Sequence, residues 1–314
     1  MPEHRAPEPP PLARAGIDRA ADERSVEGLV DLLRGEAATR VVAVHGDRGL
    51  VEASGSRLHL LTPDAVGAAA EWAFLGRDAQ GAVVLLAVTA ADAEAPAAGE
   101  QAARWRALRE VGGALDPIDA GLLVEAVSLG RWLVDAPYCS ACGARTVVRA
   151  AGWARHCLAC GREHFPRTDP AVIVAVQSAD GERLLLGKNA LWAGRNMYST
   201  FAGFVEAGES LESTVAREVL EEAGIALTDV RYRGSQSWPY PRSLMLGFHA
   251  TAVPGAEARG DGEEIVDVRW FARDELAEAF AAQAQDAAGG AGFALPGPAS
   301  IAHRLILDWV ERSA

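Results

Sequence analysis

The sequence predicts an α/β chain with three parts. The first 135 residues carry short β-like runs followed by helical patterns, and the residues after 168 alternate strand and helix signals. Between them, all four cysteines of the chain lie within Cys139–Cys160. We therefore expect an N-terminal α+β domain over residues 1–135, a cysteine module over 136–168 and a C-terminal α/β domain over 169–314.

Composition and charge exclude several classes of protein. With 314 residues, 49% of them hydrophobic, the chain can bury a sizeable core. A net charge of −13 excludes binding to nucleic acid or anionic membranes through a positive field of the whole protein. The longest apolar run, about Ala82–Val88, is far too short to span a bilayer, and the proline-rich start lacks the apolar segment of a signal peptide. We expect a cytoplasmic protein without membrane contact.

The N-terminal part has no catalytic constellation. Residues 1–11 hold too many prolines to pack regularly. Apolar runs bounded by Gly and Asp predict strands at Val41–Val44, Leu58–Leu61 and Ala82–Val88. Helical patterns predict helices at about Glu100–Val111 and Asp119–Val134.

The C-terminal part predicts five strands and three helices. Strands are expected at Ala171–Gln177, Arg183–Leu186, Val230–Gly234, Leu244–Thr251 and Ile265–Trp270. Helices are expected at Leu211–Ala223, Asp274–Gln283 and Ser300–Arg312, with a loose stretch at Gln285–Pro298. Ser210 suits the N-cap of the first helix, and Gly224 suits the position just past its end.

The four cysteines have the spacing of a zinc site. In Cys139-x2-Cys142-x14-Cys157-x2-Cys160, each pair presents two sulfurs to one tetrahedral ion. Four thiolates leave no position for a reacting water, so we expect one structural zinc ion per chain. The alternatives are reduced structural cysteines or a redox pair. Because five arginines accompany one glutamate between Cys139 and Thr168, a nucleic-acid-binding zinc ribbon is a competing interpretation.

An acidic helix face carries the chemistry of the C-terminal part. At about 100° per residue, Glu218, Glu221 and Glu222 stand on one side of the helix predicted over Leu211–Ala223. Three neighbouring acids repel one another unless a hard cation neutralises them, and oxygen ligands suit Mg²⁺ or Mn²⁺. A solvated surface rich in glutamate is the alternative.

The pattern around this face resembles the Nudix box of the Nudix hydrolases. It is Gly-x5-Glu-x7-Arg-Glu-Val-x-Glu-Glu-x-Gly-Ile, from Gly203 to Ile225, with no departure at its signature positions. The resemblance implies a C-terminal α/β/α sandwich and metal-dependent hydrolysis of a nucleoside diphosphate linked to another group. It also implies these roles: Glu218 and Glu222 as metal ligands, Glu221 as a ligand or the base, the Ala202 carbonyl as a further ligand, and a Glu209–Arg217 salt bridge.

A second motif, Ser235–Ser243, follows the box. Its two prolines fix φ and remove donors, so we expect a rigid loop. Trp238 and Tyr240 offer flat faces for a nicotinamide or adenine ring, and the polar contacts offered come from Gln236, Arg242 and Ser243. The alternative is a loop that only packs or lies in a subunit interface.

This second motif is similar to the S-Q-P-W-P-F-P-x-S array of the NADH pyrophosphatases, the NudC subfamily. Ser237 stands where that subfamily has Pro, and Tyr240 where it has Phe. The order of the three domains is also similar. The resemblance implies that the substrate contacts are Phe165, Gln236, Ser237, Trp238, Pro239, Tyr240, Pro241, Arg242, Ser243 and Ala302. It places the distal metal ligand at Glu264, with Glu263 as the alternative register.

The resemblance to NudC implies a reaction and a partner. Mg²⁺ or Mn²⁺ would support cleavage of NADH or NAD⁺ into NMNH or NMN plus AMP, and the same cleavage would remove NAD caps from RNA. Members of the subfamily are homodimers, so a second copy of the chain is expected. One alternative is a Nudix hydrolase of ADP-ribose or another dinucleotide, because Ser237 loosens the backbone before Trp238. Another is a non-catalytic zinc-ribbon protein that binds nucleotides or nucleic acid.

Overall fold

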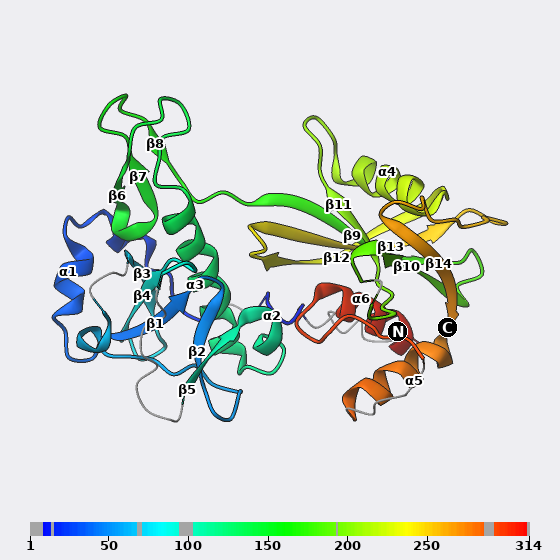
Figure 1. Cartoon of the computed structure of the whole chain (residues 1–314), viewed down its shortest axis with the longest axis horizontal. Helices are drawn as coiled ribbons and strands as arrows, with labels where there is room; N and C mark the ends of the chain where they lie inside the picture. The colour runs from blue at the N-terminus through cyan, green and yellow to red at the C-terminus, as the bar shows by residue number, and fades with distance from the viewer. Residues whose placement is uncertain are drawn as a thin grey trace, which may run out of the picture. The chain divides into compact units, whose positions relative to one another are not determined.

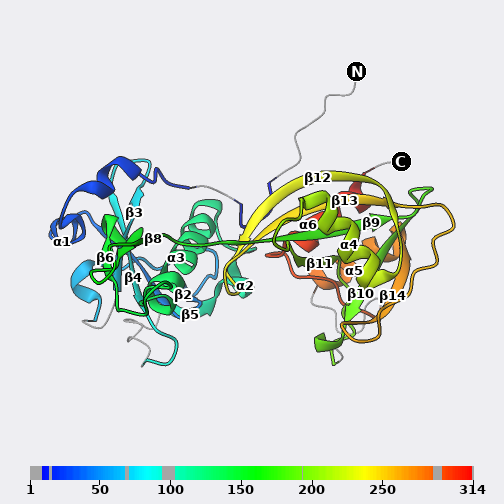
Figure 2. The same ribbon diagram turned by 90° about the horizontal axis from the view of Figure 1, so that it is seen from above.

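The computed structural model describes residues 9–13, 16–67, 71–93, 103–192, 194–285 and 292–312. The chain divides into two compact units, whose elements are drawn in Figures 1 and 2. The N-terminal unit comprises Leu12–Thr168 with Ser237–Arg242, and the C-terminal unit comprises Asp169–Gln236 and Ser243–Ala314 with Met1–Pro11. Among the helices of the described ranges, none is both long and apolar enough to cross a membrane.

A five-stranded sheet forms the centre of the N-terminal unit. Its order is β3 (Glu71–Arg77), β4 (Val83–Thr89), β1 (Arg40–His45), β2 (Arg48–Glu52) and β5 (Ala103–Ala107). Strands β1 and β4 are parallel, and the other neighbours are antiparallel. Outside the cysteine module, the helical elements of this unit are η1 (Ala21–Ser25), α1 (Leu29–Arg34), η2 (Pro63–Ala65), α2 (Leu108–Val111) and α3 (Pro117–Asp135).

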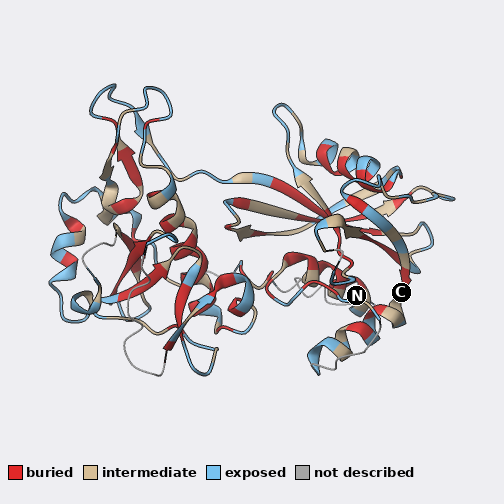
Figure 3. Cartoon of the chain, viewed as in Figure 1, coloured by how far each residue is buried: buried red, intermediate tan, exposed pale blue. Residues whose placement is uncertain are grey.

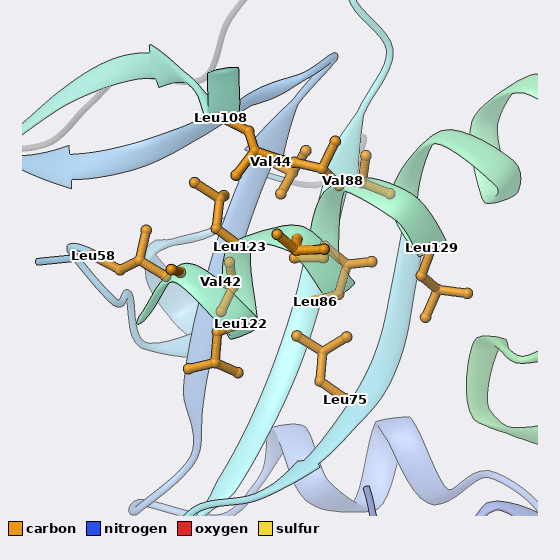
Figure 4. Close-up of a cluster of buried hydrophobic side chains, with 14 of the residues drawn as sticks. Val42, Val44, Leu58, Leu75, Leu86, Val88, Leu108, Leu122, Leu123 and Leu129 are labelled. Carbon is orange, nitrogen blue, oxygen red and sulfur yellow. The ribbon is translucent and has the colours of Figure 1, made fainter. Parts of the chain in front are cut away.

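Helix α3 supplies much of the core of this unit. The carboxylate of Asp116 accepts the amide N–H of Ile118 at 3.1 Å, and Pro117 occupies the first helical position, where no amide donor is needed. The buried leucines and valines of α3 pack with those of β1 and β4 in one cluster (Figure 4). Removal of this apolar surface from water is the main stabilising term of the unit.

The cysteine module is a small sheet of three strands, β6 (Val147–Arg149), β7 (Ala154–His156) and β8 (Glu163–His164), with η3 (Ala150–Gly152) between the first two. Gly152 has φ 98°, and a Cβ there would lie 2.2 Å from the Cβ of Ala73 on β3. Only glycine allows this approach of the module to the larger sheet. Buried Arg155 donates to the carbonyl of Leu133 at the end of α3. The tips of the two cysteine turns are exposed (Figure 3).

A six-stranded sheet forms the C-terminal unit. Its order is β12 (Leu227–Trp238), β13 (Ser243–Ala252), β9 (Asp169–Gln177), β10 (Arg183–Asn189) and β14 (Ile265–Ala272), and β11 (Phe201–Phe204) pairs with β9. Strands β12 and β13 lie side by side in both views of the ribbon (Figures 1 and 2). The helical elements are η4 (Ala190–Trp192), α4 (Leu211–Ala223), α5 (Arg273–Ala284) and α6 (Ile301–Glu311).

Strand β9 explains the three layers of this unit. Val172, Val174 and Val176 pack in the cluster of α4, whereas Ile173 and Ala175 pack in the cluster of α5 and α6. Successive side chains of a strand point to opposite faces, so a strand covered on both faces is apolar at every position. The predicted α/β/α arrangement is confirmed.

One predicted helix is wrong. Within the described part of Glu100–Val111, residues 103–107 form β5 and only Leu108–Val111 is helical. Ala103 and Ala107 are buried, while Arg104 and Arg106 are exposed and the whole segment pairs with β2. The alternation of small buried and charged exposed side chains therefore outweighs the helix propensity of this segment, which forms a strand. Residues 100–102, like residues 1–8 and residues 286–291 of the expected loose stretch, lie outside the described ranges.

Two other expectations also need correction. Leu58–Leu61 is no strand, because Leu58 bridges to Val51 and Leu61 to Val41, so its two ends pair with different strands. The predicted rigid loop Ser235–Ser243 is largely strand, since β12 continues through Trp238 and β13 begins at Ser243. The other predicted elements coincide with β1, β4, α3, β9, β10, α4, β12, β13, β14, α5 and α6, whereas α1, β2, β3 and β11 were not predicted.

Replacing Glu125 of α3 by glutamine should stabilise the protein at alkaline pH. Burial raises the pKa of this glutamate to about 7, against opposing effects of Arg19 and Arg24. The pKa of Glu125 is higher in the folded protein than the unfolded value of 4.5, so ionisation of this buried group lowers the free energy of unfolding. This loss of stability is absent below the unfolded pKa and complete above about pH 7. We expect Glu125→Gln to raise the free energy of unfolding by about 3 kcal/mol near pH 8.5 and to change it little near pH 4.5. Urea titrations at both pH values test this, and equal effects would contradict it.

Candidate functional site

Both ends of helix α4 are fixed by local chemistry. The Ser210 hydroxyl accepts the amide N–H of Ser213 at 3.2 Å, and the helix ends at Gly224 in the left-handed region with φ 68°. A serine N-cap and a glycine at the C-terminal end satisfy backbone groups that would otherwise lack partners. Both predicted caps are confirmed.

The three predicted acids of α4 have different environments. Glu218 is 9% exposed and Glu222 is 5% exposed, whereas Glu221 is exposed. Glu218 and Glu222 are one turn apart and so lie on the same buried side of the helix. The three carboxylates predicted to share one face are therefore a buried pair, Glu218 and Glu222, with the solvated carboxylate of Glu221 beside them.

Strand β11 lies against this buried pair. A Cβ on Gly203 would lie 1.9 Å from the carboxylate carbon of Glu218, so the carboxylate occupies the space that any other residue would fill. The backbone of Ala202, the preceding residue, hydrogen-bonds to Glu222 and lowers its pKa. Position 203 must therefore be glycine if Glu218 is to keep its place.

The surroundings of Glu222 disfavour its charge. Burial raises the pKa of Glu222 to about 8, and the nearby carboxylates of Glu264 and Glu218 act in the same direction. Burial likewise raises the pKa of Glu218, against the opposing effect of Arg217. Within the described residues, Glu222 Oε2 is buried and has no hydrogen-bond partner. A buried oxygen without a donor, among other carboxylates, fits a hard divalent cation.

Arg217 connects this helix to the preceding loop. Its guanidinium donates to Glu209 at 2.7 and 2.9 Å, to Glu218 at 2.9 Å and to Glu221 at 3.0 Å. It also donates to the carbonyl of Phe204 at 3.0 Å. The hydrogen bonds from Arg217 are the largest cause that lowers the pKa of Glu209 to about 2. The predicted Glu209–Arg217 salt bridge is present.

Glu264 lies in the loop before β14. Asn189 donates to Glu264 Oε1 at 3.2 Å, and Asp261 Oδ1 accepts the backbone N–H groups of Glu263, Glu264 and Ile265 at 2.8, 3.0 and 2.9 Å. The charge of Glu264 raises the pKa of both Glu218 and Glu222. The geometry therefore favours Glu264 over Glu263. Sequence analysis missed Asn189 and Asp261, although the Asp261-Gly262 turn signal was available.

The four cysteines fit a zinc ion. They are free thiols, and their sulfurs all lie within 4.8 Å of one another. Cys139 and Cys160 are 3.6 Å apart and Cys142 and Cys157 are 3.5 Å apart, close to the roughly 3.8 Å edge of a tetrahedron of Zn–S bonds. Backbone hydrogen bonding at Ala141 is the main cause that lowers the pKa of the Cys139 thiol to about 6. Among the described side chains, this is the one group of three or more metal-ligating residues so close together.

Comparison with known proteins identifies the family. Three family models match successive parts of the chain: a NADH pyrophosphatase-like rudimentary NUDIX domain at residues 38–132, a NADH pyrophosphatase zinc ribbon domain at 135–165 and a NUDIX domain at 167–289. The NAD-capped RNA hydrolase NudC of Mycobacterium tuberculosis is 39% identical over 312 residues, which cover 96% of this chain and 94% of that protein. This chain belongs to the NudC family of Nudix hydrolases.

Two further relatives match part of the chain. The NAD-capped RNA hydrolase NudC of Stutzerimonas stutzeri is 45% identical over 174 residues, which cover 55% of this chain and 62% of that protein. The NAD-capped RNA hydrolase NUDT12 of Macaca fascicularis is 36% identical over 201 residues, which cover 62% of this chain and 42% of that protein.

The aromatic rings of the second motif are engaged in packing in this NudC-family chain. Ser237–Arg242 belong to the N-terminal unit, where Trp238 packs against the core around α3. The Tyr240 hydroxyl accepts the amide N–H of Arg109 at 3.0 Å, and burial raises the pKa of Tyr240 to about 12. The segment therefore packs, as the alternative interpretation of the motif expected. Sequence analysis did not single out Arg109, which contacts Tyr240.

The predicted substrate contacts divide between the two units. Those in the N-terminal unit are Phe165, Ser237, Trp238, Pro239, Tyr240, Pro241 and Arg242. Those in the C-terminal unit with the carboxylates are Gln236, Ser243 and Ala302. Phe165 is 47% exposed, whereas buried Gln236 donates to the carbonyl of Ala299 at 3.0 Å and Ala302 is buried in the first turn of α6.

A methyl group at position 203 should weaken binding of a divalent cation. Gly203→Ala places a Cβ in the space of the Glu218 carboxylate, which must move away from Arg217 and Glu222. We expect the affinity for Mn²⁺, measured by calorimetry, to fall at least about tenfold, the size of one lost charge interaction. Gly194→Ala is the control, because a Cβ there meets nothing within 4 Å. Equal Mn²⁺ affinity of the two variants would contradict the placement of the site.

Zinc should be stoichiometric and structural. We expect about one zinc ion per chain by elemental analysis and a lower content in Cys157→Ser, because a tetrahedral site that loses a thiolate binds zinc much more weakly. The same variant should unfold at a lower temperature, since zinc binding is coupled to folding of the ribbon. A wild-type protein that is purified without zinc and unfolds at the same temperature with or without added zinc would contradict this expectation.

Proposed function

We propose that this chain hydrolyses the diphosphate bond of NADH or NAD⁺ to give NMNH or NMN and AMP, and that it removes NAD caps from RNA by the same cleavage. The buried Glu218–Glu222 pair carries the proposal, because Glu222 Oε2, which has no hydrogen-bond partner among the described residues, lies near the charge of Glu264 and fits a cation that binds diphosphate. The printed names of the relatives, NAD-capped RNA hydrolases, support the choice of substrate.

Each residue of the site has a proposed task. Glu218, Glu222, Glu264 and the carbonyl of Ala202 hold Mg²⁺ or Mn²⁺, which when bound neutralises diphosphate charge and favours attack by water. Glu221 is solvated at the edge of the pair, where it either binds a cation or accepts the proton of the attacking water. The oxygen of that water bonds to phosphorus as the P–O–P bond breaks, and the departing phosphate takes the electron pair.

The substrate contacts and the assembly are part of the same proposal. We assign the nucleotide to Phe165, Ala302 and the motif Gln236–Ser243, and we expect a homodimer in the cytoplasm, where cysteines stay reduced for zinc. One observation favours a second candidate, the hydrolysis of ADP-ribose or another dinucleotide. Trp238 and Tyr240 are occupied by packing, and this packing weakens the case that they stack on nicotinamide.

Product analysis tests the proposal. The purified protein with Mn²⁺ is incubated in parallel with NADH, ADP-ribose and a short NAD-capped RNA. We expect AMP and NMNH from NADH and a 5′-monophosphate end on the RNA. Cleavage of ADP-ribose alone would establish the second candidate, and nucleotide binding without any hydrolysis would leave only the non-catalytic interpretation.

Two variants of α4 test the metal ligands. Glu222→Gln should lower kcat roughly 10²–10³-fold, because a neutral amide replaces a charged ligand in a buried site. Glu212→Gln is the matched control on the same helix, since Glu212 is exposed in the first turn. Unchanged circular dichroism in both variants excludes unfolding as the cause. Full activity of Glu222→Gln would overturn the assignment of Glu222.

A further inference from the structure

The zinc ribbon is positively charged within an acidic protein. Over residues 139–168, five arginines against one glutamate give four net positive charges in a chain whose net charge is −13. A zinc ion with four thiolates would subtract two of these charges and leave a surplus of two. Neither the zinc site nor the carboxylate site on α4 uses this positive charge.

Three of the ribbon arginines have no carboxylate partner. Arg145, Arg149 and Arg162 are exposed, and none of them makes an ion pair within the ranges that the structure describes. Other exposed arginines do have a partner, as Arg106 has in Glu110 at 3.3 Å. Guanidinium groups that no side chain neutralises are available to an anion from outside the chain.

An exposed aromatic ring lies beside one of these arginines. Tyr138 is 60% exposed and forms an antiparallel β-bridge with Arg145 across the first cysteine turn. Side chains directly opposite each other in an antiparallel pair share one face, with Cβ atoms about 5 Å apart. The phenol ring and the guanidinium group therefore form one exposed surface that combines a flat ring with a positive charge.

The three arginines are distributed over the ribbon and do not converge on one point. Arg145 follows the first cysteine turn and Arg162 the second, and the tips of both turns are exposed (Figure 3). Arg149 ends β6, four residues beyond Arg145, which is roughly 13 Å of extended chain at about 3.3 Å per residue. Separated charges of this kind suit a polymer with many phosphates better than a single small anion.

We infer that the ribbon surface formed by Tyr138, Arg145, Arg149 and Arg162 binds single-stranded RNA, as the RNA body behind the cap of a NAD-capped transcript. Guanidinium groups bind phosphates of any sequence, and unpaired bases stack on an exposed aromatic ring. Phe165, which is assigned to the nucleotide above, is not part of this surface. The identity of the RNA rests on the proposed function, whereas the binding itself requires no hydrolysis.

Fluorescence anisotropy of a labelled single-stranded RNA with a 5′-monophosphate, without added divalent cation, tests the binding. The triple variant Arg145→Ala, Arg149→Ala, Arg162→Ala should flatten the slope of log K against log salt by about 2, because each phosphate contact on a single strand contributes about 0.7. Equal slopes for the triple variant and wild type would overturn the inference. Wild-type binding to phosphatidylserine vesicles without binding to RNA would also overturn it.

A matched control removes the same charge elsewhere in the N-terminal unit. Arg40→Ala, Arg48→Ala and Arg104→Ala, combined in one variant, lie on strands of the five-stranded sheet, where all three arginines are exposed without ion pairs among the described residues. This control should keep the salt slope of wild type, and a slope as flat as that of the ribbon variant would overturn the placement. Zinc content and unfolding temperature, measured on both triple variants, establish that each is folded.

Two single positions test the ring and the sign of the charge. Tyr138→Ala should weaken RNA binding at least about fivefold, whereas Tyr138→Phe should retain it, because stacking requires the ring and not the hydroxyl. Glu163→Gln removes the one acid of the ribbon and should tighten RNA binding, which damage to the fold would not do. Equal binding by Tyr138→Ala and Tyr138→Phe, or weaker binding by Glu163→Gln, would overturn the surface as assigned.

Kinetics with two substrates separate this inference from the proposed function. The ribbon variant should raise KM for a NAD-capped RNA and leave kcat/KM for NADH unchanged, because NADH has no RNA body. Hydrolysis of both substrates with the KM values of wild type, or an equal loss of kcat/KM on both, would overturn the inference and leave the proposed function standing. RNA binding that the ribbon variant loses, with no hydrolysis by wild type, would support the ribbon surface and remove the proposed function.

Discussion

One guanidinium group makes the acidic helix possible. Arg217 donates to Glu209, Glu218 and Glu221 and to the carbonyl of Phe204, so it offsets the repulsion among three carboxylates and holds the preceding loop on the helix. Its geometry is that of a fork with several fixed donors, which lysine lacks. The positions of Glu218 and Glu221 on α4 therefore depend on their contacts with Arg217.

Arg217 does not reach the innermost acid. Glu222 lies one turn beyond Glu218, buried with an oxygen that has no partner within the described residues, and Glu264 adds to its repulsion. The apolar side of α4, with Val215 and Val219 in the core, offsets this local cost. A site that is unfavourable in the protein alone and favourable with a bound cation is what a metal-dependent enzyme requires, and stability elsewhere in the fold supports it.

The predictable features depend on residues close together in the sequence. The bounds of α4 and its caps follow from helical spacing and capping residues, the Glu209–Arg217 contact follows from the resemblance to the Nudix box, and the cysteine cluster follows from two short repeats. Strand β5 was missed because its alternation involves alanine and arginine, whose helix propensity outweighs the signal in a short window. The packing of Trp238 was not decided by sequence, because it depends on α3 about a hundred residues earlier.

Two features could not be predicted from the sequence for a different reason. They are the contacts that position Glu264 and the surroundings of Glu125. Asp261 acts through three backbone amides of the next turn, and an aspartate before glycine is common in ordinary turns, so its sequence signal is not specific. Glu125 looks in sequence like one acid on a helix of mixed polarity. What distinguishes it is that its Oε1 has no hydrogen-bond partner within the described ranges and that arginines from segments before and after α3 lie around it. Such a feature is a property of three-dimensional surroundings, and no spacing within the chain encodes it.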